Sequence, residues 1–192
     1  MALITGRPVG ILGTGMSIPK KILTNEDLEK IVDTSDEWIV SHTGIRTRHA
    51  VSGDESNTSL ATDAANQAIR DAGISAEDVD MVIVGTNSPD TLLPGVGPLV
   101  QAALGATHAG GMDIQAGCPG GLFAMTTAAA GVAAGLWNNV VVVGSEAMTA
   151  LTDWTDRNTC VLFGDGAGAC VVGAWQPGMM RLTHFDLKAD GT

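Results

Sequence analysis

Residues 113–123 read Asp-Ile-Gln-Ala-Gly-Cys-Pro-Gly-Gly-Leu-Phe, and this stretch decides the fold. It predicts a short strand, a sharp turn and a long helix of small residues, with Cys118 at the helix N-terminus. Pro119 suits the first turn of a helix, where a proline costs no hydrogen bond. The N–H groups and the positive dipole end there would stabilise a thiolate and a neighbouring oxyanion. Cys118 is therefore a candidate nucleophile; the alternative is a small core residue, because free cysteine is among the most buried residue types.

The composition of the 192-residue chain is that of a tightly packed α/β protein, with 45% hydrophobic residues and 25 glycines. A net charge of −11 and only 10 scattered basic residues argue against a nucleic-acid partner. The three cysteines share no CxxC spacing and the four histidines lie far apart, so neither a disulfide framework nor a metal site is indicated. The sequence shows no signal-peptide pattern and no apolar run of membrane-spanning length. We therefore expect no membrane partner and a reducing cytoplasm.

Strands and helices alternate along the chain, which favours a layered α/β sheet. Apolar runs and turn residues predict strands at residues 9–16, 45–49, 81–85, 112–116, 140–144, 169–172 and 180–187. Caps and helical spacing predict helices at residues 24–32, 33–44, 56–73, 100–105 and 118–135. The last helix has almost no polar residue, so we expect it to be buried all round.

Two glycine-rich segments look like nucleotide-binding motifs but fit them poorly. Gly13-x-Gly15 lacks a third glycine and Pro19 interrupts the following helix, so we interpret it as a tight strand exit. Residues 163–169 are followed by neither a lysine nor a helix, so we interpret them as a turn that leads into a strand. The two arginines and the histidine of residues 45–49 are interpreted as a solvated face.

Four sets of residues occur in the order and at the spacing of one known enzyme family: 34–39 with 43–46, 113–121, 143–146 and 163–169. Together they resemble the front part of β-ketoacyl-acyl-carrier-protein synthase III, of the thiolase superfamily, over residues 10–191. The resemblance implies the N-terminal half of a thiolase-like layered fold, with a mixed β-sheet flanked by helices and a buried central helix. Residues 1–192 would form one N-terminal thiolase-like domain that carries the nucleophilic cysteine.

The resemblance also implies a function. Cys118 would take an acyl group from acyl-coenzyme A as a thioester and pass it to the carbanion of a decarboxylated malonyl thioester, held on an acyl carrier protein. Such a reaction begins fatty acid or polyketide synthesis and needs no cofactor besides the coenzyme A substrate. The backbone N–H of Cys118 would be one oxyanion donor. The residues at the family's substrate-binding positions are Trp38 and Arg157 around the adenine, Thr34 beside the nucleotide, Leu93 in a dimer partner's acyl pocket, and Phe163 near that pocket.

Three departures from the family pattern affect the expected binding of coenzyme A and the expected shape of the acyl pocket. His42 stands where the family has an arginine beside the nucleotide, which removes a permanent phosphate partner. Residues 119–121, Pro-Gly-Gly, replace the usual small-Gly-Phe and would reshape the pocket floor. Leu93 is narrower than the aromatic residue of acetyl-selective members, so we infer a roomier pocket and a primer larger than acetyl.

The family's catalytic histidine and asparagine lie in the second half of the fold, which is absent from this chain. Half of such a fold would expose the apolar side of its sheet and of its central helix. We expect decarboxylative condensation to need a second half, from a longer chain, a cleaved segment or another polypeptide, with a homodimer or heterodimer as the assembly. Two alternatives stay open: acyl transfer to an oxygen or amine acceptor, and a non-catalytic subunit that completes a heterodimer. The presence of Cys118, Trp38 and Arg157 disfavours the non-catalytic subunit.

Overall fold

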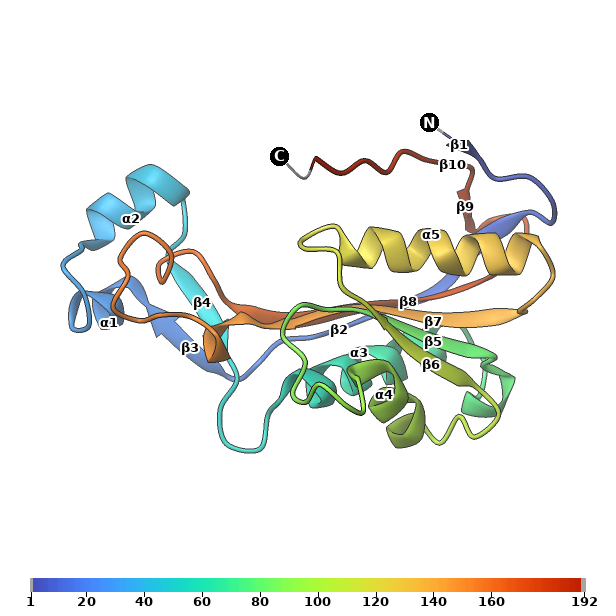
Figure 1. Cartoon of the computed structure of the whole chain (residues 1–192), viewed down its shortest axis with the longest axis horizontal. Coiled ribbons are helices and arrows are strands. Elements are labelled where there is room, and N and C mark those ends of the chain that lie inside the picture. Colours follow the sequence, from blue (N-terminus) through green and yellow to red (C-terminus); the bar gives the residue numbers. More distant parts are fainter. Residues whose placement is uncertain (1, 191–192) are drawn as a thin grey trace.

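The computed structural model describes residues 2–190 and shows a layered α/β architecture (Figure 1). A six-stranded sheet has the order β6-β5-β7-β8-β2-β9. Its strands are β2 (Val9–Ser17), β5 (Met81–Gly85), β6 (Gly110–Ile114), β7 (Asn139–Ala147), β8 (Asp165–Ala174) and β9 (Met180–Leu182). β5 is parallel to β6 and β7, whereas the β7–β8, β8–β2 and β2–β9 pairs are antiparallel. The predicted mixed sheet flanked by helices is confirmed.

Helices cover both faces of this sheet. α3 (Asn57–Asp71) and α4 (Val96–Leu104) lie on one face, and α5 (Gly120–Ala133) lies on the other (Figure 1). Each face has its own apolar core, because alternate residues of a strand point to opposite faces. Val82 and Val84 of β5 pack in the α3–α4 core, and Ile83 packs in the α5 core.

The α3 helix has the predicted caps and lies unusually close to β2. Ser56 accepts a hydrogen bond from the Ser59 N–H at one end, and Gly73 takes a left-handed φ of 67° beyond the other. A Cβ on Gly15 would lie 2.2 Å from the carbonyl oxygen of Ala64, so only glycine allows this approach. Gly13 and Gly15 therefore lie inside a strand, and their interpretation as a strand exit was wrong.

The helix after Cys118 is not buried all round. One face of α5 packs on the sheet through Ala124, Ala128 and Val132, which are fully buried. Leu122 on the same helix is 53% exposed, and Leu136 just beyond it is 73% exposed. The sheet covers only one side of the helix, so the apolar outer side stays partly uncovered. The expected exposure of this helix in half of such a fold is confirmed.

A smaller module lies at one end of the molecule (Figure 1). It contains the antiparallel pair β3 (Lys21–Thr24) and β4 (Thr47–Ala50) with the helices α1 (Asn25–Glu29) and α2 (Asp36–Thr43). Its core joins Leu28 and Ile39 of these helices to Cys160 and Val161, which come from far along the chain. A further pair joins β1 (Ala2–Leu3) to β10 (His184–Phe185). The strand predicted at residues 180–187 is divided into β9 and β10, and β1 and β3 were not predicted.

Two other interpretations were wrong in whole or in part, because contacts distant in sequence decided the structure. Of the residues interpreted as a solvated face, Arg46 is exposed, but Arg48 is buried. Arg48 is only 5% exposed and donates hydrogen bonds to the carbonyl oxygens of Leu23 and Val161, at 3.3 and 3.1 Å, instead of facing solvent. Its burial lowers the pKa of the guanidinium from its usual value. The glycine-rich residues 165–168 belong to β8 and pair with both β2 and β7, so they are strand and not turn.

The α4 helix begins at Val96 and not at Val100. The Asp113 carboxylate on β6 accepts hydrogen bonds from the N–H groups of Val96 and Gly97, at 2.8 and 2.5 Å. This carboxylate caps the helix, and Pro98 fits within its first turn. The strand that leads to Cys118 is thus tied to α4.

Candidate active site

Cys118 lies in the turn between β6 and α5. Gly117 before it has a φ of 65°, a left-handed conformation that favours glycine. Pro119 occupies the N-cap position of α5, so Cys118 stands one residue outside the position that the sequence predicted. Hydrogen bonds from the N–H groups of Gly120 to the Gly117 oxygen, 3.0 Å, and of Leu122 to the Pro119 oxygen, 2.9 Å, close the turn. The predicted strand, turn and helix are confirmed.

The Cys118 side chain is exposed, whereas Cys160 and Cys170 are buried. This exposure excludes the alternative of a small core residue within the chain. Burial raises the pKa of the Cys160 thiol, and it raises the pKa of the Cys170 thiol to about 11. Both buried thiols are therefore poor nucleophiles at neutral pH.

The N-terminus of α5 packs on two strands, and at Gly85 only glycine allows the approach. A Cβ on Gly85, the last residue of β5, would lie 2.5 Å from the carbonyl carbon of Gly120. A Cβ on Gly144 in β7 would lie 3.8 Å from the Cα of Gly121. The turn that carries Cys118 therefore rests against the carboxyl ends of β5 and β7, the edge where sheets of this kind place their ligands.

A polar network supports this turn from behind. The side-chain oxygen of Asn87 accepts a hydrogen bond from the Gly117 N–H at 3.1 Å. The side-chain nitrogen of Asn87 donates to the Glu146 carboxylate at 2.6 Å. Sequence reasoning missed both side chains as members of the site. The signal that was present is a polar residue two positions after the end of β5 and another near the end of β7.

Trp38 and Arg157 meet although 119 positions separate them in the sequence. The guanidinium carbon of Arg157 lies 4.8 Å from the centroid of the Trp38 ring, a cation–π contact. The His42 ring stacks on Trp38 as well, with centroids 4.4 Å apart and planes at 23°. Arg157 also lies 3.9 Å from the exposed carboxylate of Asp33. The structure thus brings two of the predicted nucleotide-binding residues together, with His42 beside them.

Thr34 lies at the entrance to α2, the helix that carries Trp38. Its hydroxyl is buried and has no hydrogen-bond partner among residues 2–190. The adjacent Ser35 caps α2 by accepting a hydrogen bond from the Trp38 N–H at 3.1 Å. The helix is also anchored from α1, where the Asn25 side chain donates to the Asp36 carboxylate at 2.7 Å.

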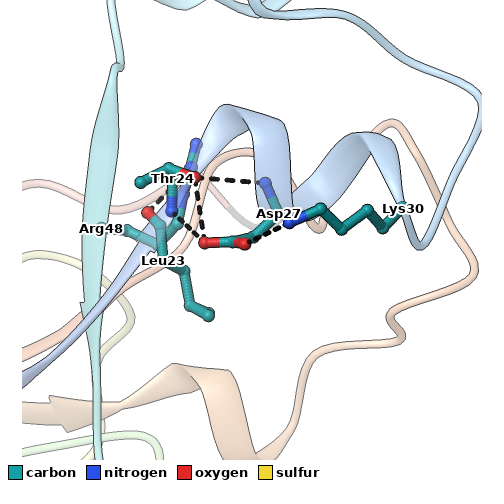
Figure 2. Close-up of polar contacts among 5 residues, drawn as sticks. All are labelled: Leu23, Thr24, Asp27, Lys30 and Arg48. Carbon is teal, nitrogen blue, oxygen red and sulfur yellow. Dashed lines mark hydrogen bonds and ion pairs between the residues drawn. The ribbon is translucent and has the colours of Figure 1, made fainter.

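The start of α1 is fixed by a capping box, shown in Figure 2. The Thr24 hydroxyl accepts a hydrogen bond from the Asp27 N–H at 3.2 Å, and the Asp27 carboxylate accepts one from the Thr24 N–H at 3.1 Å. Lys30 adds an ion pair to that carboxylate at 3.0 Å. Lys30 and Thr24 together hold the pKa of Asp27 down at about 2. Arg48 bonds the adjoining Leu23 carbonyl in the same view, so cap and strand are held together.

Leu93 and Phe163, the two residues expected near the acyl pocket, differ in their exposure. Leu93 is 89% exposed on the loop between β5 and α4, so most of its surface contacts no other residue of this chain. Phe163 is partly exposed just before β8. Their roles in an acyl pocket stay predictions.

Within residues 2–190 we found no group of three or more histidine, cysteine, aspartate or glutamate side chains placed to hold a metal ion. Across the same part of the chain, every helix is too short or too polar to cross a lipid bilayer.

The sequence of this chain is similar to those of known proteins. The family model for 3-oxoacyl-[acyl-carrier-protein] synthase III matches residues 112–191, a region that contains Cys118, Arg157 and Phe163. A β-ketoacyl-[acyl-carrier-protein] synthase III of Bacillus anthracis is 48% identical over 184 residues. That alignment covers 96% of this chain and 59% of the relative. The chain is a homologue of β-ketoacyl-acyl-carrier-protein synthase III and corresponds to its N-terminal portion.

Solved structures of the synthase III family agree with this assignment. The 3-oxoacyl-[acyl-carrier-protein] synthase III of Aquifex aeolicus superposes with a TM-score of 0.84 at 47% identity, over 86% of this chain and 53% of that protein. The priming β-ketosynthase of a polyketide biosynthetic pathway superposes with a TM-score of 0.86 at 35% identity, over 91% and 52%. The predicted thiolase-like fold is confirmed, and the chain spans little more than half the length of these relatives.

Proposed function

We propose that this chain carries the acyl-accepting part of a synthase III-type condensing enzyme. The observation that supports the proposal best is the exposed Cys118 at the N-terminus of α5, in a chain whose other two cysteines are buried. The Cys118 thiolate attacks the carbonyl carbon of an acyl-coenzyme A. The resulting oxyanion collapses, the bond to the coenzyme A sulfur breaks, and that thiolate leaves and takes up a proton. The product is an acyl thioester on Cys118.

The condensing step consumes this thioester. Decarboxylation of a malonyl thioester on an acyl carrier protein releases carbon dioxide and leaves a carbanion. The carbanion attacks the acyl carbon, and Cys118 leaves as a thiolate. We propose that the acid–base groups of this step belong to the part of the family fold that the chain does not span, since it covers 59% of the Bacillus anthracis relative.

We propose that the smaller module, formed by β3, β4, α1 and α2 (the α2 module), holds the nucleotide of coenzyme A. The Arg157 guanidinium, which lies 4.8 Å from the centroid of the Trp38 ring, would move away from that ring to admit the adenine between the two groups. The Thr34 hydroxyl, which is buried without a partner among residues 2–190, would turn outward to form a hydrogen bond with the same nucleotide. Leu93 would wall the acyl pocket of a dimer partner, and Phe163 would line the pocket from the other side. Because Leu93 is narrower than the aromatic residue of acetyl-selective members, we propose a primer larger than acetyl.

Mass spectrometry tests the proposal directly. The protein, at the full length that its gene encodes, is mixed with acyl-coenzyme A of several chain lengths and digested. We expect the mass of the acyl group to be added to the peptide that contains Cys118. The variant Cys118→Ala should gain no adduct, and Cys170→Ala, which changes a buried thiol, should keep it. A folded wild-type protein that gains no adduct would contradict the enzyme and favour a non-catalytic subunit.

A further inference from the structure

The side chain of Asn87 holds the turn that carries Cys118, because it bonds the turn at one end and Glu146 at the other. Gly117 precedes the cysteine, and its N–H donates to the side-chain oxygen of Asn87 at 3.1 Å. The carbonyl oxygen of Gly117 accepts the Gly120 N–H within the turn. Of the two backbone hydrogen bonds of Gly117, one closes the turn on α5 and the other fixes it to the end of β5. Asn87 thus sets where the turn sits relative to the sheet.

Glu146 determines which way the Asn87 amide points. A carboxylate only accepts hydrogen bonds, so the Asn87 nitrogen must face Glu146 and the oxygen must face Gly117. Glu146 also accepts the Asn87 backbone N–H at 3.0 Å. The carboxylate therefore holds both the backbone and the side chain of Asn87.

Glu146 is itself held by buried groups that have no contact with the turn. The Ser88 hydroxyl donates to its second oxygen and accepts the Ala147 N–H at 2.8 Å. The side-chain nitrogen of Asn57, which is fully buried, donates to the Ser88 carbonyl oxygen at 2.7 Å and to the Thr86 hydroxyl at 2.8 Å. The network reaches from the start of α3 through the ends of β5 and β7 to the turn. Only the part of this network around Asn57 and Ser88 is buried, and its hydrogen bonds restrain the partly exposed Glu146 and Asn87 from behind.

We propose that Asn87 and Glu146 are positioning residues that set the location of the Cys118 sulfur for acyl transfer, an inference that rests on the proposed function. Neither side chain bonds the thiol, so they act through the Gly117 backbone. Nucleophilic attack requires the sulfur within about 3–3.5 Å of the acyl carbon and in line with it, and a misplacement of about 1 Å costs on the order of 100-fold in rate. Loss of the anchor should therefore slow acylation and leave coenzyme A binding, at Trp38, intact.

The test exchanges the two groups of the anchor. In the full-length protein, Asn87→Asp sets a second carboxylate against Glu146 and removes the donor between them. The double variant Asn87→Asp with Glu146→Gln restores a donor and an acceptor in swapped positions. At saturating acyl-coenzyme A, we expect Cys118 acylation to slow about 10- to 100-fold in the single variant. The double variant should recover most of that loss, and the KM for acyl-coenzyme A should change less than twofold in both.

Asn139→Ala is the matched control. Asn139 begins the same strand, β7, at the end opposite to Glu146, and its side chain donates to the Asp78 carbonyl oxygen at 3.0 Å. This variant should lower the melting temperature without changing the acylation rate per folded molecule. A double variant no faster than Asn87→Asp, or an Asn139→Ala protein slowed equally, would overturn the proposal.

Alkylation of Cys118 by iodoacetamide separates this inference from the proposed function, because the probe needs no acyl-coenzyme A. If the wild type gains no acyl adduct, the proposed function fails. The positioning role then stands only if alkylation at neutral pH is several-fold slower in Asn87→Asp and recovers in the double variant. Equal alkylation rates in all of these proteins would overturn it.

Discussion

At the scale of single residues, the surroundings of Trp38 suit the stacking of a planar ligand on its ring. It is partly exposed, it stacks on His42, and it lies under the Arg157 guanidinium. The ring packs against the core of Leu28 and Ile39, and its remaining contacts are with two cationic or titratable side chains. An aromatic ring of this kind binds planar ligands by stacking.

Trp38→Ala should raise the KM for acyl-coenzyme A about tenfold and leave the maximal rate of Cys118 acylation unchanged. The reason is that stacking on a nucleotide contributes to ground-state and transition-state binding alike. Steady-state or single-turnover acylation over a range of substrate concentrations separates the two constants.

Trp175 provides the matched control for this experiment. It carries a similar cation–π contact, with the Arg181 guanidinium carbon 5.3 Å from its ring, and it lies at the end of β8, outside the α2 module. Trp175→Ala should leave the KM unchanged. A similar rise of KM in both variants would mean that Trp38 acts through stability and not through binding.

At the scale of single elements, the α1 cap links pH to the stability of the module that carries Trp38. Lys30 and Thr24 hold the pKa of Asp27 at about 2, below its ordinary value of 3.8. A lowered pKa means that the folded protein prefers the carboxylate. The stability from this cap is therefore complete above about pH 4 and is lost as the pH falls toward 2.

Asp27→Asn should remove this contribution. Urea denaturation at several pH values between 2 and 5 gives the unfolding free energy, and its slope against pH counts the protons taken up on unfolding. We expect the variant to take up fewer protons in this range than the wild type, by up to about one. Identical slopes in the two proteins would show that the cap does not form.

The elements that sequence reasoning predicted well are those whose signals are local. α3 has a serine cap, a periodic apolar stripe and a terminal glycine, all within 18 positions, and β5 is a single apolar run. β3 and the glycine-rich start of β8 were missed because their partners, not their own residues, make them strands. The Asn87–Glu146 contact spans 59 positions and rests on side-chain direction, which no local pattern encodes. The turn at Cys118 was predictable from the sequence, but the hydrogen bonds of Asn87 and Glu146 that support it were not.

At the scale of the whole molecule, the region around α5 leaves apolar surface uncovered. Leu122 and Leu136 are exposed on it or beside it, and an open apolar groove of about 420 Å³ runs between the helix and the sheet along Gly121, Met125 and Val142. Residues 1–192 expressed alone should therefore bind a hydrophobic dye and self-associate at micromolar concentration.

Size-exclusion chromatography with dye fluorescence measures this effect. Leu122→Gln with Leu136→Gln should reduce both dye binding and association, because these large apolar side chains, on α5 and just beyond it, are each more than half exposed. Leu151→Gln, at an exposed leucine outside α5, is the control and should change neither. A monomeric wild-type fragment without dye binding would show that the surface is covered.

The core of the α2 module also has a consequence for protein synthesis. Leu28 and Ile39 are made early, but Cys160 and Val161, which complete their core, are translated more than 110 residues later. A nascent chain on the ribosome therefore holds two short helices with no core between them until residue 161 has left the exit tunnel. Closure across so long an intervening segment carries an entropic cost. The contact between Trp38 and Arg157 can therefore form only late in synthesis, close to the point at which β8 (Asp165–Ala174) joins β7 to β2 and completes the sheet.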